Sequence, residues 1–374
     1  MITLLFATFA LVAFIERATN DLLVDQRDAE GRRLRREAYS ALEVTLAVLE
    51  EFREVGNGLH SPAEGWHDPL AFAGYTPSDD RKVEIAFEDE SGKISLPRAD
   101  AQVLTRLFQS WDIPQTESES LADALMGWMQ RDYTYRTSVT PDYEQGSIPY
   151  ETPGRSLRSF NELAAIALVR EKFYDSGGRP NDLWRRFAAA VSLLNFPKPN
   201  LNGARADSLV ALGQFDSMSQ QNLSDYLSGA GAYRAQGPGY FRNVNEASQL
   251  AGAGGNANAF GTTISALRIT VTVIDGLSRF RLSAVVTPQG GGASPVQTTA
   301  TATRARAAAN ASTNAQQQAQ QAAAQQAQKQ AAPSPTASDR ATAIVRDLKY
   351  PFTLLEIREN DEISSAPPPP PAAL

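Results

Sequence analysis

The stretch that decides the fold is ITLLFATFALVAFIERATNDLLVDQRDAEGRRLRREAYSALEVTLAVLEEF, which spans residues 2–52. Its first part, residues 2–15, is an unbroken apolar run that ends at Glu16 and Arg17. As a helix this run is about 21 Å long, whereas the hydrocarbon core of a bilayer is about 30 Å thick. We expect the run to lie in a membrane as the beginning of a longer helix. The side chains assigned to the lipid are those of Leu4, Leu5, Phe6, Phe9, Leu11 and Phe14.

A secretory signal peptide is an alternative for this apolar run. No basic residue precedes the run in this sequence, and no small-residue cleavage site of the A-x-A type follows it. The residues beyond it instead continue as a helix-compatible sequence. An ordinary single-pass anchor is a second alternative, and the N-terminal segment by itself leaves it open.

Beyond the apolar run, the pattern is that of an amphipathic helix. Residues 20–52 contain no proline, and their only glycine is Gly31. Apolar residues recur every three or four positions, while charged residues such as Arg32, Arg33 and Arg36 occupy the opposite side. We expect the apolar stripe to lie on a globular domain, and we also assign it to packing against the helices of partner proteins. The stripe residues with this assignment are Leu34, Ala38, Leu42, Leu46 and Leu49.

Short segments in two distant parts of the chain predict strands. Residues 82–88, KVEIAFE, alternate apolar and polar side chains, as a half-buried strand does. Residues 267–274 and 280–286 do so on either side of Asp275-Gly276, which predicts a hairpin. Residues 352–357, FTLLEI, add a last candidate. The prediction is an α+β fold in which a long N-terminal helix lies on a small antiparallel sheet.

Between the first strand and the hairpin, the pattern is helical and contains an internal repeat. The segment LPRADAQVLTRL, residues 96–107, aligns with LNGARADSLVAL, residues 201–212. Each copy is expected to open with a short extended stretch followed by a helix. Such units resemble helix-hairpin-helix or SAM-like modules. We therefore predict a large all-α domain, made of two such units and inserted between strands of the sheet.

Composition argues against several classes of function. The formal net charge is −7 and the pI is about 5.1, so phosphate backbones are repelled and no nucleic acid is expected as a partner. There is no cysteine, which excludes disulfides and thiolate metal sites. His60 and His67 lie in a Gly- and Pro-containing stretch and are interpreted as loop residues. No nucleophile elbow, P-loop or zinc-protease motif is present, so no enzyme activity is predicted, with a carboxylate-based hydrolase left open.

The order of these features resembles the K-type minor pseudopilins of type II secretion, over about residues 1–287 and the last strand. The resemblance implies a pilin-like helix and sheet with a helical domain inserted between strands. It also implies a basic leader ending in Gly, which we expect upstream of the first residue of this sequence. The matching segments are VEIAFEDESGKISL (83–96), LADALMGWMQRD (121–132), SFNELAAI (159–166) and PNLNGARADSLVAL (199–212).

The same resemblance implies a calcium site, because some members of that family bind calcium after the Trp-containing helix. Calcium takes about six to eight oxygen ligands. Gly127 and Gln130 depart from the family pattern, which often has Asp at both positions, and a solvated acidic loop is the alternative. The carboxylates that remain available are those of Asp132, Asp142, Glu144 and Glu151. Calcium is the only cofactor expected.

The remaining segments are of low complexity. Residues 288–340 are rich in Gly, Ala, Thr and Gln, and the chain ends in a proline-rich tail. The predicted organisation is an N-terminal helix (1–55), a loop and first strand (56–93), an inserted helical domain (94–255), a returning hairpin (256–287), a linker (288–340) and a last strand with the tail (341–374).

The resemblance implies a structural function. The chain is expected to form the tip of the type II secretion pseudopilus, without catalysis, and to support export across the outer membrane. Other minor pseudopilins and the bacterial inner membrane are the expected partners, with a single pass through that membrane and the globular part in the periplasm. The alternative is a single-pass envelope binding or scaffold protein whose helical domain is a recognition module.

Overall fold

A computed structural model of the protein describes residues 2–138, 141, 143, 149–252, 254–288, 292–295 and 351–360. Residues 2–8, 10 and 80 are described by their backbone alone. The helices are α1 (Ile2–Gly56), α2 (Pro69–Phe72), α3 (Ala101–Gln109), α4 (Gln115–Met129), α5 (Ala167–Phe173), α6 (Asp182–Ala190), α7 (Ala206–Ala211), α8 (Ser217–Ser228) and α9 (Val244–Ala251). The strands are β1 (Lys82–Asp89), β2 (Ile94–Ser95), β3 (Val191–Ser192), β4 (Leu267–Asp275), β5 (Ser278–Pro288) and β6 (Phe352–Glu359).

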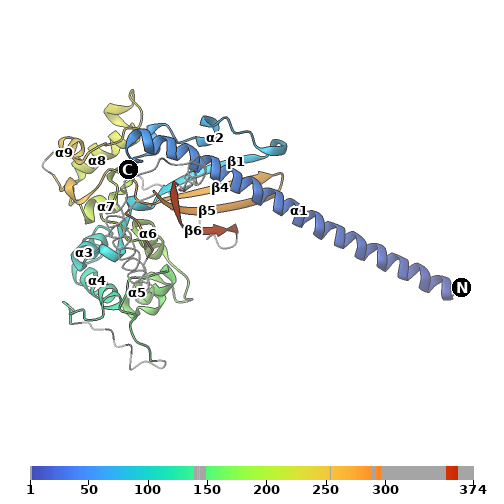
Figure 1. Ribbon diagram of the computed structural model, residues 1–374. Helices are drawn as coiled ribbons and strands as arrows, with labels where there is room; N and C mark the ends of the chain where they lie inside the picture. Colours follow the sequence, from blue (N-terminus) through green and yellow to red (C-terminus); the bar gives the residue numbers. More distant parts are fainter. Residues whose placement is uncertain are drawn as a thin grey trace, which may run out of the picture. The chain divides into compact units, whose positions relative to one another are not determined.

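The helix α1 is continuous from Ile2 to Gly56, as the absence of proline predicted. Its C-terminal half lies along strands β4 and β5, as Figure 1 shows. Residues 11–28 are exposed, except for Ala18, which is half-buried. The helix therefore changes from an exposed segment to a segment with a buried apolar stripe, as predicted. The change occurs near Leu34, where α1 meets the sheet.

The apolar stripe of α1 is buried in the chain's own core. Its members are each at most 3% exposed and belong to one cluster with apolar side chains of β4 and β5. The expected packing on a globular domain is confirmed, whereas the assignment to partner helices is wrong. Side chains that their own sheet removes from water have no surface left for a partner, and each fully buried leucine stabilises the fold by about 1.5–3 kcal/mol. The corrected residues are Leu34, Ala38, Leu42, Leu46 and Leu49.

The sheet is antiparallel with the order β1-β4-β5-β6. β1 and β4 pair over the whole of β1, with Lys82 opposite Ile274 and Asp89 opposite Leu267. The hairpin between β4 and β5 turns at Gly276, which has a φ of +57°. β6 pairs with β5, so the four strand segments predicted from the sequence join one sheet, as expected.

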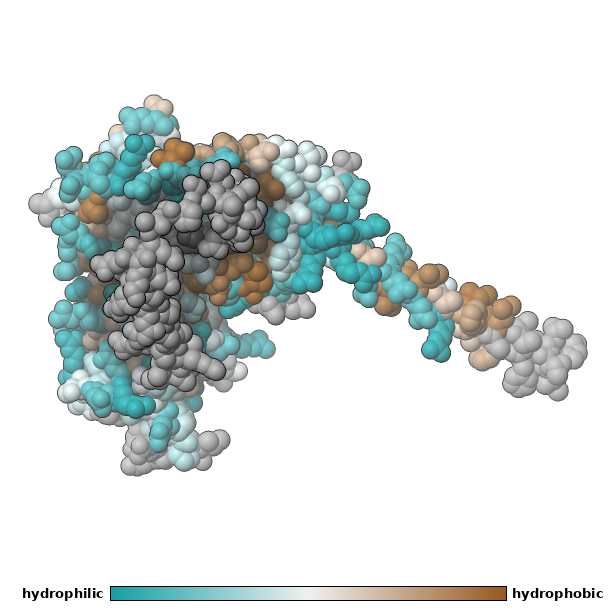
Figure 2. All heavy atoms as spheres, viewed as in Figure 1, coloured by the Kyte–Doolittle hydropathy of each residue, from teal (hydrophilic) through white to brown (hydrophobic). Residues whose placement is uncertain are grey.

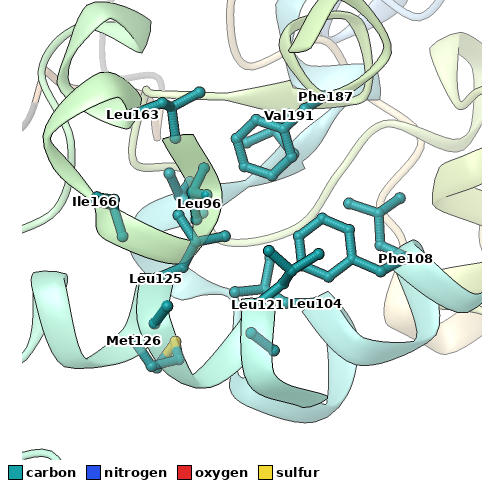
Figure 3. Packing of buried hydrophobic residues seen from close by; sticks show 14 of the residues in the cluster. Leu96, Leu104, Phe108, Leu121, Leu125, Met126, Leu163, Ile166, Phe187 and Val191 are labelled. Carbon is teal, nitrogen blue, oxygen red and sulfur yellow. The ribbon is translucent and has the colours of Figure 1, made fainter. Parts of the chain in front are cut away.

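The segment between β1 and β4 forms two helical units with separate cores. Each unit opens with a 3₁₀ turn, at Leu96–Arg98 and Leu201–Gly203, and continues as α3 or α7. The core of the first unit gathers aromatic and aliphatic side chains around Phe108, as Figure 3 shows. The core of the second unit surrounds Phe215 and Phe260. The repeat found in the sequence therefore corresponds to a repeated local structure.

The two helical units contact each other through α3 and α7. The Trp111 Nε1–H donates to Asp207 Oδ1 at 2.9 Å, and Arg106 Nε donates to the Ala211 carbonyl at 2.8 Å. The core beneath α1 takes one residue, Ile264, from the end of the segment between β1 and β4, whereas the two cores of the insert lie entirely within that segment. Most of the predicted linker and the proline-rich tail lie outside the described residues.

Candidate functional site

The N-terminal half of α1 carries exposed apolar side chains. Phe9 is 73% exposed, Phe14 69% and Leu22 69%, and Leu11 is exposed as well. Figure 2 shows the apolar residues toward the N-terminal end of the helix, with charged residues between them and the sheet. Contiguous exposed apolar surface marks a place where lipid or another protein binds.

Three of the six residues assigned to lipid are described with their side chains, and Phe9, Leu11 and Phe14 are all exposed. The side chains of Leu4, Leu5 and Phe6 lie outside the described residues. Among the helices that the structure describes, none is both long enough and apolar enough to cross a bilayer.

Charges of both signs lie along the exposed part of α1. Arg17 and Arg27 alternate with carboxylates, whereas all charged side chains from residue 32 to residue 36 are arginines, around the start of the buried stripe. The carboxylates are those of Glu16, Asp21, Asp25, Asp28 and Glu30. We call the four residues that follow Gly31 and flank Leu34 the arginine cluster, and they are Arg32, Arg33, Arg35 and Arg36.

One member of the arginine cluster is tied to the sheet. Arg35 Nε donates to Glu359 Oε1 at 3.0 Å, and the Tyr39 hydroxyl donates to the same oxygen at 2.6 Å. These bonds raise the pKa of Arg35 and lower that of Glu359. Arg32, Arg33 and Arg36 are exposed and make no ion pair with any residue that the structure describes.

A buried carboxylate fixes α1 against the strands. The Tyr75 hydroxyl donates to Glu37 Oε1 at 2.5 Å, and the Ser78 N–H donates to it at 3.2 Å. Burial raises the pKa of Glu37, but these hydrogen bonds and the charge of Arg81 outweigh burial, so the pKa lies below its ordinary value. Arg81 Nε in turn donates to Asp275 Oδ2 at 3.0 Å, so α1 and the end of β4 share one network.

A second network joins the sheet to the helical insert. Asp89 Oδ1 accepts from the Ser91 N–H at 2.8 Å, and Asp89 Oδ2 accepts from Asn200 Nδ2 at 2.7 Å. Asn200 Nδ2 also donates to the His60 carbonyl at 2.9 Å. Asp89 as a residue is only half-buried, but its carboxyl group is enclosed, with Gly203 against Oδ2. Burial of the carboxyl group raises the pKa of Asp89 to about 6.

The histidines have different surroundings. His60 is in a loop, as interpreted, but it is buried, and its Nδ1 lies 2.8 Å from Glu64 Oε1. Trp66 Nε1 donates to the other oxygen of Glu64 at 3.0 Å. His67 is exposed. These contacts hold the loop after α1 in place next to Asn200.

The loop after α4 is organised by Asp123. This buried carboxylate accepts from the Tyr133 hydroxyl at 2.6 Å and from the Arg136 and Thr137 N–H groups at 2.7 Å each. Its oxygens are thus occupied by donors of the chain itself. Gly127, which stands where the family often has Asp, leaves room for Tyr135, because a Cβ there would lie 2.1 Å from its hydroxyl.

The residues predicted to bind calcium are not brought together by the described part of the chain. Asp132 and Glu151 are exposed, whereas Asp142 and Glu144 lie outside the described residues. Within the residues that the structure describes, no group of three or more His, Cys, Asp or Glu side chains is placed to hold a metal ion. Calcium binding therefore stays a prediction.

Two features of the site escaped the sequence analysis. The sequence predicted the arginine cluster only as the polar side of an amphipathic helix. Four arginines without an intervening carboxylate around the start of the buried stripe are nevertheless a visible signal of a charged surface. The joint between Asp89 and Asn200 had no such signal, because its partners are far apart in the chain.

Comparison with known proteins finds a family model that matches part of the chain. Residues 87–177 match the family model described as Type II secretion system (T2SS), protein K, which confirms the resemblance seen in the sequence for this part. No curated protein matches the chain. Among solved structures, one similar chain comes from "The Crystal Structure of the GspK-GspI-GspJ complex from enterotoxigenic Escherichia coli Type 2 Secretion System". It shares 13% identity and a TM-score of 0.48, over 70% of this chain and 93% of that chain.

Proposed function

We propose that this chain, whose residues 87–177 match the protein K family of type II secretion, is a minor pseudopilin at the tip of the pseudopilus. The observation that carries the proposal is that this match falls on the end of β1 and on the first helical unit, next to a continuous pilin-like α1. The function is mechanical: the chain is assembled with other subunits and supports export across the outer membrane without catalysing a reaction.

The position of the insert supports the proposed location of this chain at the tip of the pseudopilus. The Ile264 N–H donates to the Leu59 carbonyl at 2.6 Å, and Asn200 binds the His60 carbonyl, so the insert joins the chain just beyond the C-terminal end of α1. The exposed apolar half of α1 is at the opposite end of the same helix. A helical domain in that place obstructs a further subunit above it, while the apolar half is left for lipid and then for partners.

The proposed partners are other minor pseudopilins and the bacterial inner membrane. Before assembly, the apolar start of α1 anchors the chain in that membrane, and the globular part lies in the periplasm. Nucleic acid is not a proposed partner, since the chain is acidic overall.

Purification from membranes tests the proposal. A tagged chain with its upstream coding sequence is expressed in its host, solubilised in mild detergent and captured, and the bound proteins are identified. We expect several other pilin-like proteins, and we expect accumulation of secreted cargo in the periplasm when the gene is deleted. The control is Phe9→Ser with Phe14→Ser, which is expected to leave the globular fold intact and to reduce capture.

A different result supports the envelope scaffold alternative. If the chain captures no pilin-like protein, but binds one other envelope protein through the helical insert alone, the insert is a recognition module. Normal secretion in the deletion strain contradicts the proposed role as well. Calcium is tested separately by titration of the wild-type chain and of Asp132→Asn with Glu151→Gln.

A further inference from the structure

We infer that Arg32, Arg33 and Arg36 are a docking surface for carboxylates on a parallel helix of a neighbouring minor pseudopilin. The inference rests on the proposed function, which supplies the neighbour. It assigns a role to charged side chains of α1 that neither the core nor the membrane segment uses.

The arginine cluster forms a surface with a recess. An open hollow of about 700 Å³ lies on α1, lined by Ala29, Arg32, Arg33, Arg35, Arg36 and Tyr39. Ala29 is the smallest of the lining residues, and four of the other five are arginines. Arg35 is held by Glu359 and Tyr39, so one wall is fixed to the sheet. A carboxylate entering the hollow meets guanidinium groups that can bind it with two parallel hydrogen bonds.

Lipid headgroups are too far away to occupy this surface. From Ile15, the last apolar residue of the first run, to Arg32 the helix rises by about 25 Å. The headgroup layer extends only about 5–8 Å beyond the hydrocarbon on each side. The side chains of Asp21 and Asp25 lie between, and an anionic membrane surface repels them. The occupant is therefore a protein.

The charge of α1 identifies the kind of helix. A neighbour anchored in the same membrane begins with its own apolar run, so its helix runs parallel to α1. A second copy in the same register is disfavoured, because it sets Arg32 and Arg36 against the same arginines. A different subunit that presents carboxylates at this level is complementary, and the match sets the axial position of this chain among its neighbours.

Site-specific photocrosslinking tests the inference in the full chain in its host membrane. A photoreactive phenylalanine analogue replaces Ala29, and the crosslinked partner is mapped. We expect an acidic helical stretch of another minor pseudopilin, and we expect Arg32→Glu with Arg36→Glu to reduce the crosslink by about tenfold. The matched control is Arg179→Glu with Arg234→Glu, which makes the same change in net charge at exposed sites of the insert and leaves the crosslink unchanged.

The outcomes separate the inference from the proposed function. Crosslinks to lipid or to a second copy of this chain, or an undiminished crosslink in the arginine variant, overturn the inference while the wild-type chain still captures pilin-like proteins. If the wild-type chain captures none, the proposed function fails as well. The thermal unfolding of both double variants is measured, and unchanged values are expected because all four side chains are exposed.

Discussion

At the scale of single residues, the joint between sheet and insert depends on a carboxyl group that is costly to ionise. Asp89 accepts hydrogen bonds from Ser91 and Asn200, but its enclosure favours the protonated form. In the first helical unit, Ser95 stands at the position corresponding to Asn200. Its hydroxyl donates to the Leu194 carbonyl at 2.9 Å and accepts from the Phe196 N–H at 3.4 Å. Asn200 also makes two such bonds, but it reaches Asp89 and the His60 carbonyl.

Asp89→Asn is expected to change how stability depends on pH. The folded pKa of about 6 exceeds the ordinary value of 3.8, so the folded state binds the proton more tightly than the unfolded chain does. The stabilising contribution of Asp89 is therefore complete below about pH 4 and is lost as the pH rises through about 6. Relative to the variant, the wild-type protein should lose about 2–3 kcal/mol over that window.

Urea unfolding of both proteins from pH 4 to 7 measures their free energies of unfolding. Subtracting the two values at each pH cancels the contributions of the other carboxylates. Asp25→Asn, at an exposed position on α1, is the control and is expected to show no such trend. A difference between wild type and Asp89→Asn that stays constant with pH contradicts the enclosed carboxyl group.

Gly92→Ala is expected to destabilise the protein by about 1–3 kcal/mol. A Cβ at Gly92 would lie 2.2 Å from the carbonyl oxygen of Gly203, which is backbone and has little room to move. Gly31→Ala is the matched control, because nothing lies within 4 Å of its added Cβ and alanine favours the helix. Thermal unfolding measures both, and an unchanged midpoint for Gly92→Ala would disprove the close approach of the 3₁₀ turn Glu90–Gly92 to the 3₁₀ turn Leu201–Gly203.

At the scale of elements, α1 has two halves with different partners. The half that begins at Leu34 is part of the folded core, while the half before it is exposed. Periodicity alone located the apolar stripe, but it did not distinguish a partner's helix from the chain's own sheet. The two surfaces have the same chemistry, and only the placement of β4 and β5 beneath α1 decides between them.

Leu46→Ala is expected to reduce the free energy of unfolding by about 2–5 kcal/mol, since it opens a cavity in the core beneath α1. Leu22→Ala removes the same atoms from an exposed position of the same helix and is expected to change stability by less than about 0.5 kcal/mol. Chemical denaturation of the chain alone measures both. Equal effects would mean that the stripe meets only partners.

At the scale of the whole molecule, the insert and the pilin-like part have separate hydrophobic cores. Asp89 and Leu267 are opposite each other in the sheet, so the insert leaves and returns at one place. Ser91 N–H donates to the Ala266 carbonyl at 3.2 Å, which keeps the two connections close. This arrangement is what allows a large domain to be inserted without disturbing the strands.

Replacement of residues 93–262 by a glycine-serine linker of about five residues is expected to leave a folded helix and sheet. The core beneath α1 contains no residue of the replaced segment. The loss of the Asn200 bonds to Asp89 and His60 should lower the melting temperature without abolishing cooperative unfolding. Circular dichroism measures both, and an unfolded product would show that the sheet needs the insert.

The sequence by itself determined the continuous α1, the strands and the repeat, because each depends on local periodicity and on turn residues such as Asp275-Gly276. It also indicated a resemblance to the protein K family of type II secretion, and residues 87–177 match the model of that family. Only the tertiary structure decided that the stripe of α1 is core, that Asp89 meets Asn200, and that the exposed arginines lie where α1 meets the sheet. These are contacts between residues far apart in the chain, and no local pattern encodes which surface a side chain meets.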